Sequence, residues 1–284
     1  MTVSPSSTLL AQTLIDALRL PESCWVDQRV PKKLLLENGA PTAADKRLIN
    51  DGIEEIQWVA ALKPNTIGVS DYRDDLREYL EIAVLTVTLR GASSKVDAKP
   101  TNAVRLAELV HRAVPYPVLL LLKSGHSVTL SLAHKRWAQN EAGKIVLDGG
   151  VVSVSLSDTS VPDSLNHDPL THAPMGWTEV ERLFMRSLSV SRQPQATLHT
   201  LYQGWMGCVQ ALLAARLTGS YRTAVTPEQA LARRQALADC ERLDDNISRL
   251  RAQALKEKQM ARQVSINLEI RALLTERKHI EQHL

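Results

Sequence analysis

The chain has 284 residues, of which 44% are hydrophobic and 23% are charged, and its formal net charge is +3. This length can bury a substantial core and predicts one or two domains. The net charge is too small to indicate that the chain as a whole binds nucleic acid. The longest apolar runs, such as residues 118–122, are far shorter than the roughly 20 residues that span a bilayer, so no membrane-spanning helix is expected.

The N-terminal residues and the cysteines bear on the cellular compartment. No basic region precedes the apolar part of residues 1–20, unlike in a secretory signal, so we expect a cytoplasmic protein. Cys24, Cys208 and Cys240 are odd in number and far apart, which argues against a disulfide framework or a zinc knuckle. We interpret them as buried thiols, because free cysteine behaves as a small hydrophobic residue.

The first predicted elements are two helices on either side of an extended segment. Apolar residues at helical spacing predict a helix over residues 8–18. Residues 24–39 have the pattern of a strand or extended segment, because Pro31 holds the residue before it out of the α conformation. Thr42 then predicts the cap of a helix over residues 43–62, in which apolar residues repeat every three or four positions.

The middle of the chain alternates in the manner of β-strands. Residues 79–91 are apolar on both faces, which predicts a central strand. The elements that follow are a helix over 102–113, strands over 118–123 and 126–135, and one or two strands over 144–157. This order predicts an α+β fold, with a small mixed or antiparallel sheet and flanking helices.

The sequence predicts a division into a body, a linker and a helical region. The α+β body takes residues 1–157, and residues 158–176 have the proline-broken composition of a surface loop or linker. Residues 177–284 are predicted to be all-helical. They end in a long coiled-coil-like helix over 227–284, for which Thr226 is the cap and Pro227 occupies the first turn.

This last helix carries two apolar stripes on different faces. One runs at coiled-coil spacing from Leu243 to Leu268, and the other runs from Ile266 to Leu284. Val264 and Ile266, which belong to different stripes, are about 200° apart around a helix. We therefore expect one face to pack within the chain and the other to contact a partner. The alternative is an antiparallel helical hairpin whose charges are only solvated.

Positive charge gathers in the same region. Between residues 246 and 278 there are eight Lys or Arg residues and three acidic residues, which indicates an anionic partner. Lys32 and Lys33 could also meet phosphate, although paired lysines at a domain edge are usually only solvated. The predicted partner-binding or phosphate-binding residues are Lys32, Lys33, Arg251, Lys256, Lys258, Arg262 and Arg271.

Candidate catalytic and metal-binding patterns are weak. The sequence contains no phosphate-binding P-loop, dinucleotide-binding, nucleophile-elbow or zinc-protease motif, so we predict no catalytic residue, cofactor or metal ligand. Asp74, Asp75, Glu78 and Glu81 form an acidic cluster that a divergent nuclease could use to hold a divalent metal. The lysine that would polarise water is missing after Glu81, and a solvated or capping loop is the simpler interpretation.

A loop with two histidines is the other pattern that could bind a metal ion. His167, Asp168 and His172 have ligand side chains, but they lie in a proline-broken segment and no fourth ligand is near them in the sequence. We interpret them as surface residues.

Six segments together resemble a known family. They are RVPKKLLLENG (29–39), IEEIQWVAALKPNTIGV (53–69), YLEIAVLTVTLR (79–90), HRAVPYPVLLLL (111–122), VTLSLAHKRW (128–137) and KEKQMARQVSINLEIRAL (256–273). In this order they resemble a bacterial family classified as a domain of unknown function. That family is similar to one encoded beside Swi/Snf-like helicases and type III-like DNA methyltransferases in restriction and phage-defence islands. Leu34 and Met260 stand where the family often has aromatic residues.

The resemblance implies no enzymatic activity, and three hypotheses follow. The leading one is a non-catalytic accessory or adaptor subunit of a defence system, which binds a helicase, a methyltransferase or nucleic-acid backbone through the basic C-terminal helix. The alternative is a divergent metal-dependent nuclease that uses Asp75, Glu78 or Glu81. The third is a structural protein that self-associates through its terminal helices.

Overall fold

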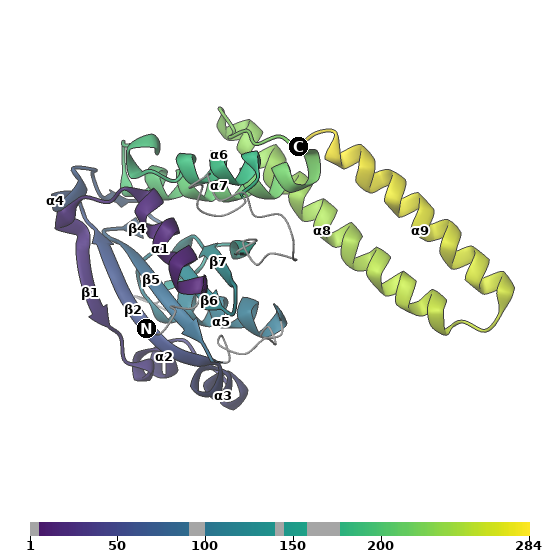
Figure 1. Cartoon of the computed structure of the whole chain (residues 1–284), viewed down its shortest axis with the longest axis horizontal. Coiled ribbons are helices and arrows are strands. Elements are labelled where there is room, and N and C mark those ends of the chain that lie inside the picture. Colours follow the sequence, from purple (N-terminus) through teal and green to yellow (C-terminus); the bar gives the residue numbers. More distant parts are fainter. Residues whose placement is uncertain (1–5, 91–99, 140–144, 158–176) are drawn as a thin grey trace, which may run out of the picture. The chain divides into compact units, whose positions relative to one another are not determined.

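The computed structural model describes residues 6–90, 100–139, 145–157 and 177–284 (Figure 1). The chain forms two compact units, residues 1–206 and 207–284, and the division falls inside helix α7. We call the first unit the body and the second the C-terminal unit. In the described residues no helix is long and apolar enough to cross a membrane.

The described elements alternate between helices and strands in the body and are helical afterwards. The helices are α1 (Ser6–Leu18), α2 (Lys32–Asn38), α3 (Ala43–Gly52), α4 (Pro64–Ile67), α5 (Pro100–Ala113), α6 (Glu179–Ser187), α7 (Leu198–Thr218), α8 (Pro227–Lys256) and α9 (Met260–Glu281). The strands are β1 (Trp25–Arg29), β2 (Ile53–Leu62), β3 (Tyr72–Arg73), β4 (Glu78–Tyr79), β5 (Ile82–Leu89), β6 (Val118–Ser124), β7 (Ser127–Leu132), β8 (Lys135–Trp137), β9 (Ile145–Leu147) and β10 (Val152–Ser157).

A six-stranded sheet organises the body, in the order β1-β2-β5-β6-β7-β10. Only β5 and β6 pair in parallel within this sheet, because α5 carries the chain back between them, and the other neighbours are antiparallel. Two short hairpins, β3–β4 and β8–β9, form separate two-stranded sheets. The predicted α+β fold with a mixed sheet, flanking helices and a helical C-terminal region is therefore confirmed.

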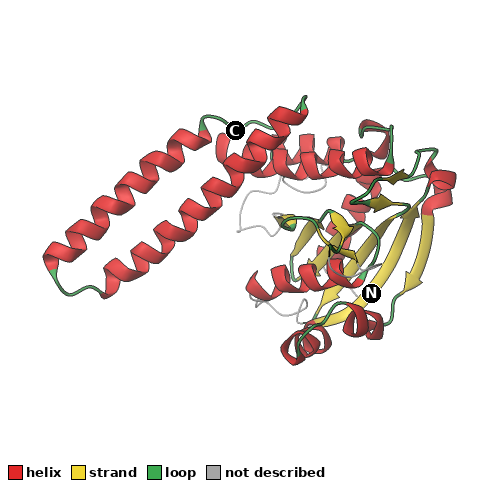
Figure 2. Cartoon of the chain, turned by 180° about the vertical axis from the view of Figure 1, so that it is seen from behind, coloured by secondary structure: helices red, strands yellow, loops and turns green. Residues whose placement is uncertain are grey.

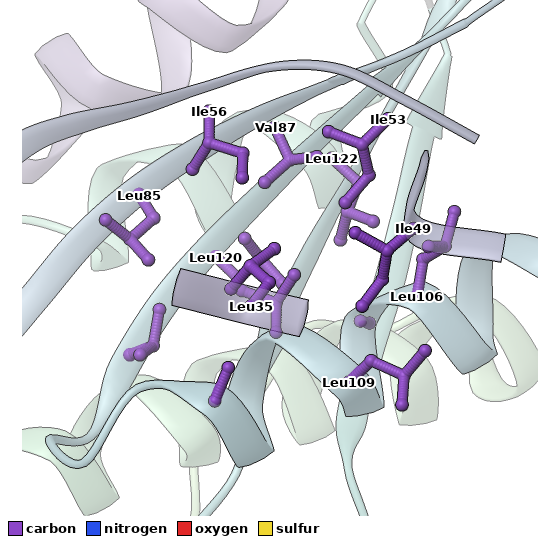
Figure 3. Close-up of a cluster of buried hydrophobic side chains, with 14 of the residues drawn as sticks. Leu35, Ile49, Ile53, Ile56, Leu85, Val87, Leu106, Leu109, Leu120 and Leu122 are labelled. Carbon is purple, nitrogen blue, oxygen red and sulfur yellow. The ribbon is translucent and has the colours of Figure 1, made fainter. Parts of the chain in front are cut away.

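The two faces of the sheet are covered by different helices. On one face Leu35 of α2, Ile49 of α3 and Leu109 of α5 pack against strand residues such as Ile56 and Leu120 in one buried cluster (Figure 3). Helix α1 contacts β6 and β7. The apolar stripe of each helix thus meets apolar strand residues, as burial requires.

The predicted helix over residues 43–62 is wrong in its second half. Helix α3 ends at Gly52, and residues 53–62 form β2, which pairs with β5. Irregularities in the pairing between Ile53 and Glu55 and between Trp58 and Ala60 leave apolar residues three apart on the strand. The bulges in this strand therefore give its apolar residues the same spacing as in a helix. In the segment 24–39, only β1 is extended, and Lys32–Asn38 is a helix.

The start of the helical region belongs to the body. Thr178 caps α6 through a capping box with Glu181. In the first turns of α7, the Tyr202 hydroxyl donates to the Val118 carbonyl and accepts from the Ala133 amide, while the Trp205 indole donates to the Leu188 carbonyl. The predicted boundary at 158–176 thus differs from the division at 206, because these bonds tie α7 to the sheet. Residues 158–176 themselves, with His167, Asp168 and His172, lie outside the described residues.

The C-terminal unit contains an antiparallel helical hairpin instead of the continuous helix predicted over 227–284 (Figure 2). Helix α8 ends at Lys256, and α9 begins at Met260. The backbone of Glu257 is extended, and its carboxylate accepts a hydrogen bond from the Gln259 amide at 2.9 Å. Because this turn contains neither glycine nor proline, the usual sequence signals for a helix end are absent.

Candidate partner-binding surface

The inner faces of the hairpin hold it together. Ile247, Leu250 and Ala254 of α8 are buried against Ile266 and Ile270 of α9. Outside this apolar contact, Arg277 of α9 pairs with Asp244 of α8 at 2.6 Å. The first predicted stripe, up to residue 254, and the second stripe, from residue 266, therefore face each other across the turn.

The outer face of α9 has an apolar row that the hairpin does not cover. Met260, Val264 and Leu268 are 79%, 56% and 62% exposed, and their spacing of four residues places them along one side of the helix. This side lies roughly 150° from that of Ile266 and Ile270. Leu255, in the last turn of α8, is 87% exposed. We call Leu255, Met260, Val264 and Leu268 the tip row.

Exposed cations lie on both helices of the hairpin and in its turn. Arg251, Lys256, Lys258, Arg262 and Arg271 are all exposed. None of the five forms an ion pair with another residue in the described part of the hairpin, whereas Arg277 contacts two carboxylates there. A shallow hollow beside the turn is lined by Arg249, Ala252, Gln253, Lys256 and Glu257. We call the five unpaired residues the tip cations. An apolar strip with a cationic margin matches a surface with the opposite margin.

The other two predicted site residues lie on α2 in the body. The Lys32 ammonium donates a hydrogen bond to the Ile53 carbonyl at the start of β2, and burial lowers the pKa of this lysine. Lys33 is exposed and lies 3.6 Å from Glu37, one helical turn away. Lys32 therefore has a structural partner, while Lys33 lies in a local surface ion pair.

The acidic cluster is spread over separate local contacts. Asp74 closes the turn between β3 and β4, because its carboxylate accepts from the Leu76 and Arg77 amides and from the Tyr72 hydroxyl. The Tyr72 hydrogen bond is the main cause that lowers the pKa of Asp74. The remaining contacts are the ion pairs Glu78–Arg73 and Glu81–Lys63. Within the described ranges, no three His, Cys, Asp or Glu residues are placed to hold a metal ion.

A network of aromatic and imidazole rings adjoins this turn, and the sequence did not reveal it. His199, in the first turn of α7, stacks on Tyr72 with ring centroids 4.7 Å apart and meets the edge of Tyr79 at 4.8 Å. The Tyr79 hydroxyl is hydrogen-bonded to Nδ1 of His134. Burial lowers the pKa of His199, so this ring is neutral near pH 7. These contacts fasten the β3–β4 hairpin to α7.

The chain thus has an α+β body and a C-terminal unit whose hairpin has an exposed apolar row and exposed cations. Residues 18–276 match the model of the family described as Domain of unknown function (DUF4391), so the chain belongs to that family. No curated protein and no solved structure matches the chain.

Proposed function

We propose that the protein is a non-catalytic accessory subunit of a bacterial restriction or phage-defence system, and that the hairpin docks on a protein partner. The partner we propose is a helicase or DNA methyltransferase of that system, with an apolar groove and an acidic margin. The observation that supports this most strongly is the exposed tip row, in which Met260, Val264 and Leu268 lie along the outer side of α9. The choice of a restriction or phage-defence system rests on the resemblance to a family encoded beside helicase and methyltransferase genes, which was described in the sequence analysis.

The apolar row favours a protein over a nucleic-acid backbone. Met260, Val264 and Leu268 form an exposed apolar row along one side of α9, and exposed apolar surface of this kind is typical of protein interfaces. Phosphate backbone would be matched by cations alone. The tip cations would raise the association rate and orient the partner during docking, because complementary charge raises the association rate more than the affinity.

The same charges disfavour pairing of two copies through the tip. In a symmetric dimer the tip cations of both chains would meet, and like charges at an interface cost free energy. A partner with carboxylates at the margin avoids this repulsion. Self-association through the hairpin is therefore an outcome that the experiment must separate from heterologous docking.

The test is co-elution with candidate partners. The full chain is co-expressed with a helicase or a DNA methyltransferase of a restriction or phage-defence system, and the complexes are separated by size-exclusion chromatography. Val264→Asp and Leu268→Asp should each weaken the complex by about tenfold or more, as expected for interface anchors. The matched control is Leu231→Asp, because Leu231 is 64% exposed at the other end of α8.

The charge variants distinguish the kinds of partner. Lys258→Glu with Arg262→Glu should slow association with a protein partner and reduce its salt dependence. If these reversals abolish a shift of duplex DNA while the aspartate variants leave it intact, phosphate backbone is the partner and the protein-docking proposal is wrong. All variants should keep the wild-type melting temperature, because the altered side chains are exposed.

A further inference from the structure

A groove of about 470 Å³ lies on the face of the sheet that α1 partly covers. It is lined by side chains of α1, β1, β2, β5 and β6, all of which belong to the body. This volume is in the range of small-molecule sites. The groove is independent of the hairpin and of the function proposed above.

The floor of the groove is polar, although the opposite face of the same strands is apolar. Gln57 of β2 pairs in register with Thr86 of β5, and Thr88, the next residue of β5 on this face, pairs with Lys123 of β6. The residues of these strands on the other face, such as Leu85, belong to the main buried cluster. Polar residues of the strands thus line the groove together with side chains of α1.

The β1 end of the groove has an unusual backbone. Asp27 has φ of +46°, a left-handed conformation that a non-glycine residue rarely adopts inside a strand, and the register shifts between Trp25 and Gln28. Strained residues and bulges of this kind cluster at binding sites. Both Trp25 and Asp27 line the groove, and the Trp25 side chain is 43% exposed.

Hydrogen-bonding groups at this end are partly occupied. One carboxylate oxygen of Asp27 accepts from the Gln57 amide at 2.7 Å, and no described residue contacts the other oxygen. Glu55, which also lines the groove, lies 3.6 Å from Arg29 and shares a cross-strand row with Thr88 and Lys123. An exposed indole beside an available carboxylate oxygen suits a planar ring that carries N–H donors.

The β6 end has an unpaired cation. Lys123 is half-buried, and its ammonium forms no hydrogen bond or ion pair with any described residue. Burial lowers the pKa of this lysine, and Glu55 and Glu54 oppose that shift. A half-buried ammonium without a partner is a position at which an anion is stabilising. Three strand spacings, about 14 Å in total, separate β1 from β6.

We propose that this groove binds a guanine mononucleotide, with the base against Trp25 and the phosphate at Lys123. Guanine has two adjacent N–H donors on one edge, which match a carboxylate acceptor such as Asp27. Its ring stacks on the indole, and Val59 and Ile15 line the space between the two ends. In register, Gln28 of β1 is level with Leu120 of β6, so Lys123 is displaced by three residues, about 10 Å, along the strands as well as across them.

Calorimetry with the full chain tests the proposal, with GMP, guanosine, AMP and inorganic phosphate as probes. Lys123→Met should weaken GMP binding at least tenfold and leave guanosine binding unchanged, because only the phosphate contact is lost. Trp25→Leu should weaken binding of both GMP and guanosine. Lys33→Met is the matched control, since Lys33 is an exposed lysine outside the groove, and it should bind GMP as the wild type does.

Three results would overturn the proposal. They are no heat of binding for GMP at millimolar concentration, equal affinity for AMP and GMP, and GMP binding that Lys123→Met leaves unchanged. Trp25→Leu and Lys123→Met should both fold, because neither side chain lies in the buried cluster. The melting temperature of each variant checks this. Should one variant fail to fold, the comparison of GMP with guanosine on the wild type still decides whether the phosphate contributes.

Discussion

The buried His111 makes the stability of the body depend on acid in a way that can be calculated. This histidine is fully buried in α5, its Nε2 lies 2.9 Å from the Ser131 hydroxyl, and its Nδ1 has no hydrogen-bond partner among the described residues. Burial, with a smaller contribution from Lys135, lowers the pKa of His111 from 6.5 to about 3. The imidazole therefore stays neutral in the folded chain where it would be charged in the unfolded one.

The sign of the effect follows from the lowered pKa. Because the unfolded state binds a proton below pH 6.5 and the folded state does not until about pH 3, stability is lost as the pH falls through this window. Between pH 7 and pH 4.5 the contribution of His111 to the free energy of unfolding falls by about 2.5 kcal/mol. The variant His111→Leu cannot bind this proton, so it should lose about 2.5 kcal/mol less than the wild type over the same interval.

Urea denaturation followed by tryptophan fluorescence measures this difference. All five tryptophans precede residue 207, so the signal reports on the body alone. The control is His126→Gln, because His126 is exposed on the same unit and should lose as much stability as the wild type. If His111→Leu is destabilised by acid as strongly as the wild type is, the assignment of a neutral buried imidazole is wrong.

Three further predictions concern single side chains. Burial lowers the pKa of Lys135 from 10.5 to about 7, so stability should rise as the pH increases from 7 to 9, and Lys135→Met should lack this rise in urea titrations. Ile247→Ala should lower the free energy of unfolding of the hairpin by about 2 to 5 kcal/mol, measured as loss of helical circular dichroism, because Ile247 is buried between α8 and α9. Thr178→Ala should lower the free energy of unfolding of the body by about 1 kcal/mol, because the capping box is lost. Thr275→Ala, on the exposed face of α9, should lower the free energy of unfolding of the C-terminal unit by less.

Local chemistry made much of the fold predictable. The alternating apolar residues of β5 and the caps at Thr42 and Thr226 are signals that one segment carries by itself, and β5 and the starts of α3 and α8 lie where they were predicted. The strand β2 was missed because its bulges are a property of pairing with β5, which a single segment does not display. The fold class followed from the order of elements even though one boundary was wrong.

The candidate surface was predictable in part. The sequence indicated that Val264 and Ile266 lie on different faces, and in the structure α8 covers only the face of Ile266 and Ile270. The turn at 257–259 was not predicted, because it is made by a glutamate carboxylate and not by a helix-breaking residue. The groove could not be inferred either, since register across four strands brings its residues together.

Hydrogen exchange in a purified complex tests the docking proposal most directly. Amides of residues 255–271 should exchange more slowly once the partner is bound, because the tip row and most of the tip cations lie in this range. Amides near Leu231, on the opposite end of α8, should exchange at the rate seen in the free protein. Protection confined to the body, with the range 255–271 unchanged, would contradict the proposal that the hairpin tip is the docking surface.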